Sequence, residues 1–360
     1  MAMTLGNRPS DESGARTDAG VPTQDDLAIV LSHYDLGVIQ KMQALRRGTD
    51  VSPKFVIRAE KGDYLLKRRR EGKDDLARVA YSHAVQLELL KQSFPTAEIV
   101  GTRRHNNSVV IHAGMVYEVL RWIPGQRYAG TVEQTRAAGR MLGRFHDALV
   151  AFRTMEPPPS LGGSYHGVAR VETELEGLVS GRKRELADAA AALLELYREC
   201  AAGVESAGLG EWPVQVVHGD WHPGNLLFQG DEVVGVIDLD TVRPGTRALD
   251  LATGVLQFSI TRNEGNPLTW PDHVDEERYL AFLDGYDGES ERRISHAELG
   301  VLAWLMIEAM IAESVVPVAT TGRFAAVEGG EFLDMVRRKA EWIREHASRL
   351  EGMLDQPPSS

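Results

Sequence analysis

The sequence of 360 residues is 43% hydrophobic and 26% charged, proportions typical of a soluble globular protein, and its length suggests two lobes or one large domain. Because no apolar run reaches membrane-spanning length and the start of the chain lacks an apolar signal core, we expect neither a membrane partner nor secretion. The single cysteine, Cys200, excludes an intramolecular disulfide framework and favours a reducing, cytoplasmic location.

The charge is unevenly distributed along the chain. Residues 1–125 carry 18 Lys and Arg against 15 Asp and Glu, a net charge of +3, whereas residues 126–360 carry 22 against 37, a net charge of −15. This acidic second part disfavours nucleic acid and anionic membranes as partners and favours a cationic ligand. A solvated acidic surface explains the same excess, and composition alone favours that simpler interpretation.

The first part of the chain has the pattern of short strands. Residues 1–24 lack apolar periodicity, so we expect a disordered tail. The later segments with strand character are 55–60, 64–69, 98–103, 109–113 and 115–123. The first two flank Lys61-Gly62-Asp63, a turn-sized break that predicts a β-hairpin, and helical spacing appears at 78–91. Pro124-Gly125 ends this part as a strong chain break.

Beyond residue 125 the pattern becomes mainly helical. The predicted helices are 131–152, 170–204 as one or two helices, 249–260, 276–286, 295–314 and 331–354. The predicted strands are 212–217, 225–228 and 233–237. These elements predict an α+β fold with a small β-rich N-lobe at 25–123, a larger helical C-lobe at 124–354, and a flexible tail at 355–360.

The most informative segment reads HGDWHPGN at 218–225 and is followed by IDLD at 237–240. Gly and Pro exclude a helix here, so the first motif lies in a loop between a strand and a hairpin. Asp220 is a candidate to accept a proton from an attacking hydroxyl. Asn225 begins the hairpin and Asp238 ends it, so both are candidate oxygen ligands for Mg²⁺. Asp240, two residues further in an extended segment, is expected to share a face with Asp238.

One base beside two or three metal ligands is the set of groups that phosphoryl transfer requires, because the transferred group needs positioning and charge neutralisation. Three carboxylates this close in sequence would repel one another without a cation. The motif therefore predicts Mg²⁺-dependent phosphoryl transfer.

The two motifs closely resemble those of the aminoglycoside phosphotransferase and choline kinase superfamily, small-molecule kinases with the protein-kinase-like bilobal fold. The resemblance implies that Asp220 is the catalytic base and that Asn225 and Asp238 hold Mg²⁺ with help from Asp240. It also implies an ATP-binding N-lobe and a C-lobe that carries the catalytic loop and the acceptor pocket. The implied activity is transfer of the γ-phosphate of ATP to a hydroxyl of a small, cationic acceptor, such as an aminoglycoside, an amino alcohol or a hydroxy-amino acid.

The same resemblance implies a set of nucleotide-binding residues. Lys67, at the end of the second hairpin strand, matches the lysine that pairs with the nucleotide's phosphates. Gly48 lies in 46–52, where the phosphate-covering loop is expected. The backbone from Arg121 to Ile123 matches the hinge that binds the adenine edge. His146 and Asp250 match structural residues of the family, and we expect Asp250 to brace the C-lobe.

One position departs from the family pattern. The helix after the lysine strand normally carries a glutamate that pairs with the lysine, and His83 occupies that position. Three interpretations stay open: His83 hydrogen-bonds the lysine or a phosphate, another acid holds Lys67, or the site is impaired. Two alternatives therefore stand beside a small-molecule kinase: a nucleotide-binding regulatory protein without turnover, and a kinase that acts on a protein side chain. The sequence indicates no oligomeric state.

Overall fold

The computed structural model describes residues 21–45, 52–161, 163–181, 184–261, 266–324 and 327–353. The chain divides into two compact units. Unit 1 comprises Met1–Asp74 and Ile99–Trp122, and unit 2 comprises Asp75–Glu98 and Ile123–Ser360. Each unit has a hydrophobic core of its own.

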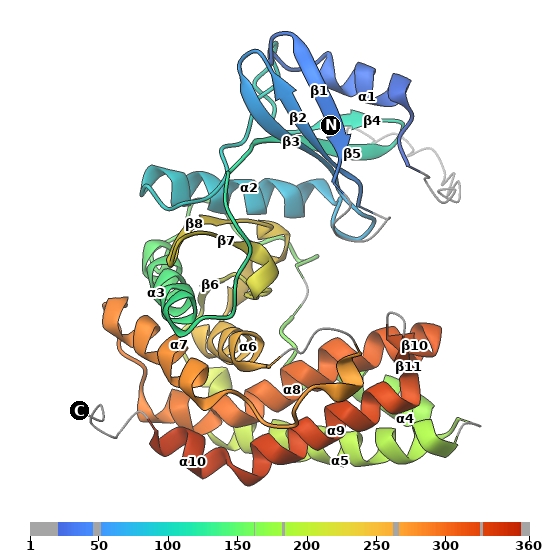
Figure 1. Ribbon diagram of the computed structural model, residues 1–360, viewed down its shortest axis with the longest axis vertical. Coiled ribbons are helices and arrows are strands. Elements are labelled where there is room, and N and C mark those ends of the chain that lie inside the picture. Colours follow the sequence, from blue (N-terminus) through green and yellow to red (C-terminus); the bar gives the residue numbers. More distant parts are fainter. Residues whose placement is uncertain are drawn as a thin grey trace, which may run out of the picture. The chain divides into compact units, whose positions relative to one another are not determined.

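Unit 1 is built on a five-stranded antiparallel sheet with the strand order β1-β2-β3-β5-β4 (Figure 1). Its elements are α1 (Gln24–Leu31), β1 (Ile39–Ala44), β2 (Lys54–Ala59), β3 (Gly62–Arg68), β4 (Val110–His112) and β5 (Met115–Arg121). Leu27 and Val30 of α1 join the same apolar cluster as Ile57 and Leu66, so the helix covers one face of the sheet.

The predicted β-hairpin is present as β2 and β3, which pair from Ala59 and Gly62 at the turn to Lys54 and Lys67 at the open end. The predicted strand at 98–103 is wrong, because this segment makes only an isolated bridge from Ile99 to β5. The periodicity also missed α1, whose start is stabilised by a capping box in which Thr23 and Asp26 bond each other's backbone N–H groups.

Unit 2 is mainly helical, with three two-stranded sheets around the predicted catalytic motifs and near its end. Its helices are α2 (Leu76–Lys91), α3 (Val132–Leu149), α4 (Ala169–Val179), α5 (Arg184–Ser206), α6 (Arg247–Ser259), α7 (Glu276–Glu289), α8 (His296–Thr321), α9 (Gly329–Glu345) and α10 (Ala347–Gly352). Its strands are β6 (Gln215–Val217), β7 (Leu226–Gln229), β8 (Glu232–Val236), β9 (Arg243–Gly245), β10 (Arg323–Phe324) and β11 (Val327–Glu328).

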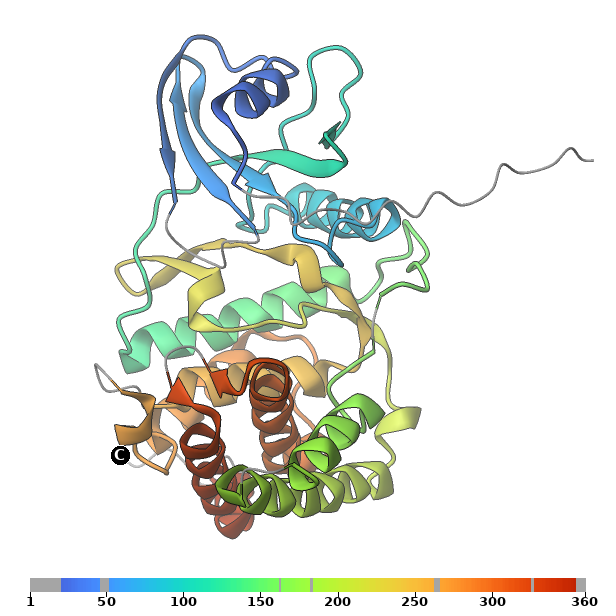
Figure 2. The same ribbon diagram turned by 90° about the vertical axis from the view of Figure 1, so that its right-hand side faces the viewer.

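The helices of unit 2 form two packing groups. α4, α5, α8 and α9 pack against one another, in yellow-green and orange to red in Figure 2. α3 packs along α7, and α6 contacts both α7 and α8. By length and composition α8 is apolar enough to cross a membrane, but most of this stretch is buried inside unit 2. It coincides with the helix predicted at 295–314.

Helix α2 groups with unit 2, whereas the sequence analysis placed its residues in the N-lobe at 25–123. The reason lies in its apolar face. Val85 and Leu89 belong to the core of unit 2, together with Phe94, whose ring meets that of Phe145 on α3 edge-on at 5.8 Å. Periodicity shows that a helix has an apolar face but not which neighbouring core receives it.

Candidate active site

The predicted catalytic segment, residues 218–225, forms the connection between β6 and β7 in unit 2. Gly219 lies in this connection with a φ of +76°. A Cβ atom at position 219 would lie 2.8 Å from the backbone oxygen of Thr241, and the left-handed backbone strains any residue with a side chain, so glycine is favoured here. A terminal guanidinium nitrogen of Arg243 donates to the backbone oxygens of Gly219 at 3.4 Å and of Thr241 at 3.2 Å. Arg243 therefore ties the loop to the segment that follows Asp238.

Asp250 braces the same loop from α6. Its carboxylate accepts hydrogen bonds from the backbone N–H groups of His218 at 2.6 Å and Gly219 at 2.8 Å, and it lies 3.1 Å from Nε2 of His146. Burial would by itself raise the pKa of the Asp250 carboxyl, but the hydrogen bonds and neighbouring imidazoles outweigh burial and lower this pKa. These contacts fit the structural roles expected for Asp250 and His146.

Asp220 and Asn225 are in direct contact. Nδ2 of Asn225 donates to the backbone oxygen of Asp220 at 2.9 Å and to its Oδ2 at 3.3 Å. The side chain of Asp220 is 40% exposed, and its Oδ1 lies 3.6 Å from Nε2 of His222. His222 is itself held by the N–H of Gly224, which donates to Nδ1 at 3.0 Å. The Asp220 carboxylate is thus oriented by Asn225 and accessible to a small molecule.

The β7–β8 hairpin brings the backbone segments of Asn225 and Asp238 side by side. Leu226 pairs with Val236, and the N–H of Ile237 donates to the oxygen of Asn225 at 2.9 Å. Asp238 follows with a φ of 64° and a ψ of 56°, a left-handed conformation that is uncommon for residues with a side chain. Residues other than glycine that adopt a left-handed backbone conformation cluster at functional sites.

The expectation that Asp238 and Asp240 share a face of an extended segment is wrong. Leu239–Thr241 forms a turn of 3₁₀ helix whose N-cap is Asp238, and Asp240 is buried within it. Residues two apart in a 3₁₀ helix point in different directions. The left-handed backbone at Asp238 ends the extended strand, so strand periodicity does not continue to Asp240.

The oxygen ligands of the loop fit a divalent cation bound together with a nucleotide. Because Nδ2 of Asn225 donates to Asp220, Oδ1 of Asn225 is the atom suited to bind the cation. Asp238 adds a carboxylate. One or two such side chains plus substrate phosphates are a common way of binding Mg²⁺. In the part of the chain that the structure describes, no group of three or more His, Cys, Asp or Glu side chains is placed to hold a metal ion.

Lys67, the predicted phosphate-binding residue, lies on β3 in unit 1, and its side chain is 5% exposed. It stands opposite Glu118 on β5, with Nζ 3.7 Å from Oε1.

Sequence reasoning missed Glu118 and Arg243. Glu118 was visible as the only acid within the apolar strand at 115–123, but Arg243 gave no signal because its contacts depend on the turn after Asp238.

The remaining nucleotide-binding candidates are Arg121, Ile123 and Gly48. Arg121 ends β5, where its guanidinium donates to the backbone oxygen of Lys61 at 2.9 Å and lies over the ring of Tyr64. Ile123 belongs to unit 2 and packs against Gly235 of β8. Gly48 lies outside the described residues.

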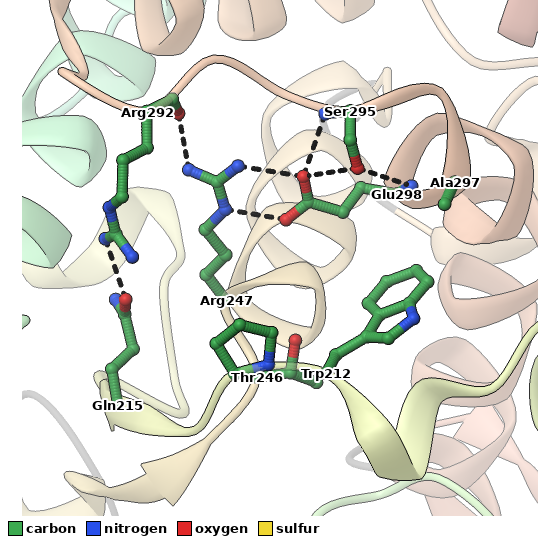
Figure 3. Close-up of a pocket in the computed structure, with 9 residues that line it drawn as sticks. Trp212, Gln215, Thr246, Arg247, Arg292, Ser295, Ala297 and Glu298 are labelled. Atoms are coloured by element: carbon green, nitrogen blue, oxygen red, sulfur yellow. Dashed lines mark hydrogen bonds and ion pairs between the residues drawn. The ribbon is translucent and has the colours of Figure 1, made fainter.

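Figure 3 shows a cavity of about 300 Å³ in unit 2 whose lining includes none of the predicted site residues. Arg247 donates from Nε to Oε1 of Glu298 at 2.6 Å, and Arg292 donates to Gln215 at 2.7 Å. Ser295 caps the helix that carries Glu298. Because these polar groups bond one another, we interpret this cavity as a structural junction between β6, α6 and α8.

Comparison with known proteins identifies the family. A sequence profile described as the phosphotransferase enzyme family matches residues 41–297, most of the chain. The homoserine kinase of Sinorhizobium fredii is 25% identical over 288 residues, which cover 79% of this chain and 80% of that protein.

Solved structures share the fold. An aminoglycoside phosphotransferase of Alicyclobacillus acidocaldarius matches with a TM-score of 0.68 and 21% identity, covering 95% of this chain and 99% of that one. A microcompartment-associated aminopropanol kinase matches with a TM-score of 0.63 and 16% identity over 90% and 97%. The predicted α+β, protein-kinase-like fold is confirmed, and so is the predicted resemblance. The chain belongs to the phosphotransferase enzyme family and is an ATP-dependent small-molecule kinase with an alcohol group as acceptor.

Proposed function

We propose that this kinase phosphorylates the hydroxyl group of a small, amine-bearing acceptor of the amino alcohol, hydroxy-amino acid or aminoglycoside type. The net charge of −15 in residues 126–360 supports a cationic acceptor. By their names, two of the similar proteins act on homoserine and aminopropanol, which both carry an amine and a hydroxyl group. The enzyme would use Mg²⁺-ATP and act in the cytoplasm, without nucleic acid or membrane partners.

The contact between Asp220 and Asn225 carries the proposal. Asp220 accepts the proton of the acceptor hydroxyl as its oxygen forms a bond to the γ-phosphorus, and the bond from phosphorus to the bridging oxygen breaks to release ADP. Asn225 holds Oδ2 of Asp220, which keeps the carboxylate turned toward one position of the hydroxyl. His222 beside Oδ1 supports the loop.

The remaining site residues bind the nucleotide. Lys67 contacts its phosphates, Gly48 belongs to the loop that covers them, and the backbone of Arg121 and Ile123 binds the adenine edge. Asn225 and Asp238 would hold Mg²⁺, with Asp240 assisting from the following turn. When bound, Mg²⁺ neutralises charge on the phosphates.

The two alternatives are not favoured. A regulatory protein without turnover has no need of Asp220 held by Asn225 beside a left-handed Asp238, and these features are all present. A kinase for protein side chains shares this machinery, but the similar proteins named above are kinases of small molecules.

The deciding experiment measures ADP release from Mg²⁺-ATP with a panel of amino alcohols, hydroxy-amino acids, aminoglycosides and neutral sugars. We expect acceptor-dependent release with an amine-bearing member. In Asp220→Ala this release should fall by about 10²- to 10⁴-fold, the usual contribution of a general base, while ATP affinity is retained.

Asp238→Asn provides a contrast with Asp220→Ala, because it changes a proposed metal ligand and leaves the proposed base intact. Because this change weakens a metal ligand, we expect it to lower Mg²⁺-dependent ATP affinity as well as turnover. Normal turnover by Asp220→Ala would refute the base assignment, and a response only to neutral sugars would refute the acceptor class.

A further inference from the structure

Helix α2 carries no acid at the position of the family's glutamate. In protein kinases the strand lysine is paired with a glutamate of the helix that follows it, and both must be in place for phosphoryl transfer. The only acidic residue of α2 is Glu88. Its carboxylate is bonded within the same helix, to Lys91 at 3.1 Å and to Gln92 at 3.2 Å. His83, where the family pattern has glutamate, is buried and contributes no carboxylate.

Glu118 provides a carboxylate from a neighbouring strand instead. It pairs in register with Lys67 across β3 and β5, and both side chains are buried, at 2% and 5% exposure. Oε1 lies 3.7 Å from Nζ of Lys67, and Oε2 accepts a hydrogen bond from Arg69 at 3.0 Å. One oxygen faces the lysine while the other is anchored by the arginine, which fixes the carboxylate plane.

Strand alternation explains why these groups meet. Tyr117 and Val119 of β5 point into the apolar core of unit 1, as do Tyr64 and Leu66 of β3. Glu118 and Lys67 alternate with these residues and therefore share the opposite face of the sheet. Opposite charges directly across an antiparallel pair attract each other, and burial strengthens the attraction.

We propose that Glu118 is the positioning residue for Lys67 and takes the part that a helix glutamate plays in protein kinases; this inference rests on the proposed phosphate-binding role of Lys67. The partners lie on adjacent, hydrogen-bonded strands of one sheet. Their pairing therefore depends on strand register and is independent of the placement of any helix. The lysine of this enzyme is held ready without the helix movement through which protein kinases are switched.

The test compares the affinities of Glu118→Gln for ATP and for adenosine, measured by titration calorimetry, and adds turnover with the responsive acceptor. We expect ATP affinity and kcat to fall by about tenfold or more, the size of a coupling within one charge pair. Adenosine affinity should stay unchanged, because adenosine has no phosphate for Lys67 to bind. Glu71→Gln, which changes an exposed acid of unit 1, is the matched control and should leave both affinities unchanged.

Several outcomes would overturn the inference. Unchanged ATP affinity and turnover would show that Glu118 does not act on Lys67. An equal loss for ATP and adenosine would show a purely structural role, and a tenfold loss in His83→Ala would return that role to α2. Should Glu118→Gln fail to fold, the double variant Arg69→Gln/Glu118→Gln restores the charge balance. Its affinities for ATP and for adenosine are then compared in the same way.

The outcome for Glu118 is separable from that for the proposed function. If the wild-type protein binds ATP but phosphorylates no acceptor, the proposed acceptor class fails. The comparison of ATP with adenosine then still decides whether Glu118 positions Lys67, because it requires no turnover.

Discussion

Glu308 on α8 has a fully buried side chain whose hydrogen-bond partners lie far away in the sequence. Nδ1 of His166 lies 3.0 Å from its Oε1, and the N–H of Gly167 donates to Oε2 at 3.0 Å. The second ring nitrogen of His166 lies 3.7 Å from Glu205, which is mostly exposed. The hydrogen bond with Glu308 raises the pKa of His166 above its ordinary value of 6.5. The folded protein therefore binds a proton on the His166 imidazole more tightly than the unfolded chain does.

Removing His166 should therefore destabilise the protein. In His166→Ala the buried Glu308 side chain loses a hydrogen-bond partner, and we expect the free energy of unfolding at pH 7 to fall by about 1–3 kcal/mol. Urea titration measures the change. The control is His296→Ala, an exposed position where a change within about 0.5 kcal/mol is expected. Equal effects of the two substitutions would contradict the assignment.

The same pair predicts how stability depends on pH. Because the pKa of His166 is raised on folding, its contribution is fully present below pH 6.5, the ordinary value, and is lost as the pH rises through the folded pKa. His166→Gln/Glu308→Gln lacks both the His166 imidazole and its hydrogen-bond partner. The free energy of unfolding of the wild type should fall more steeply above pH 6.5 than that of this double variant.

At the scale of elements, glycines allow α3 and α7 to pack closely. A Cβ atom on Gly139 would lie 1.9 Å from the backbone oxygen of Phe282, and one on Gly285 would lie 2.1 Å from that of Arg136. Neither backbone oxygen can move aside as a flexible side chain could. The two helices therefore approach along a seam that only glycine permits.

Gly139→Ala should force these helices apart. We expect destabilisation by about 1–3 kcal/mol from overpacking, measured by thermal or urea unfolding. Gly177→Ala is the matched control, because it is an exposed position in the last turn of α4 with no atom near the added Cβ. There the better helix propensity of alanine should stabilise by about 0.5–1 kcal/mol. Stabilisation by both substitutions would refute the close approach.

At the scale of the whole molecule, the acidic charge of residues 126–360 predicts a salt-dependent acceptor affinity. Attraction of a cationic acceptor weakens as salt screens the charges, so its KM should rise between about 0.02 and 0.3 M salt. The control is the matched acceptor in which a hydroxyl replaces the amine, whose KM should change little. Parallel changes in both KM values would show that the acidic charge has no part in acceptor binding.

Secondary structure followed the sequence where the signals were local. The hairpin of β2 and β3 and most helices of unit 2 agree with periodicity and with turn residues. The segment at 170–204, predicted as one or two helices, forms two, α4 and α5, and the helix predicted at 331–354 is divided into α9 and α10. The helix predicted at 295–314 continues to Thr321 although Pro317 lies within it. Boundaries depend on tertiary packing as well as on propensity, so they are predicted less well than the elements.

The sequence by itself determined the family and the chemistry, because the motifs at 218–225 and 237–240 are short and their spacing survives in the loop and hairpin that carry them. Tertiary structure alone decided that Glu118 faces Lys67, that Arg243 bonds Gly219, and that Asp240 lies in a 3₁₀ turn instead of an extended segment. These contacts depend on strand register and on one left-handed residue. Neither leaves a periodic trace in a sequence, since both arise only when distant segments pack.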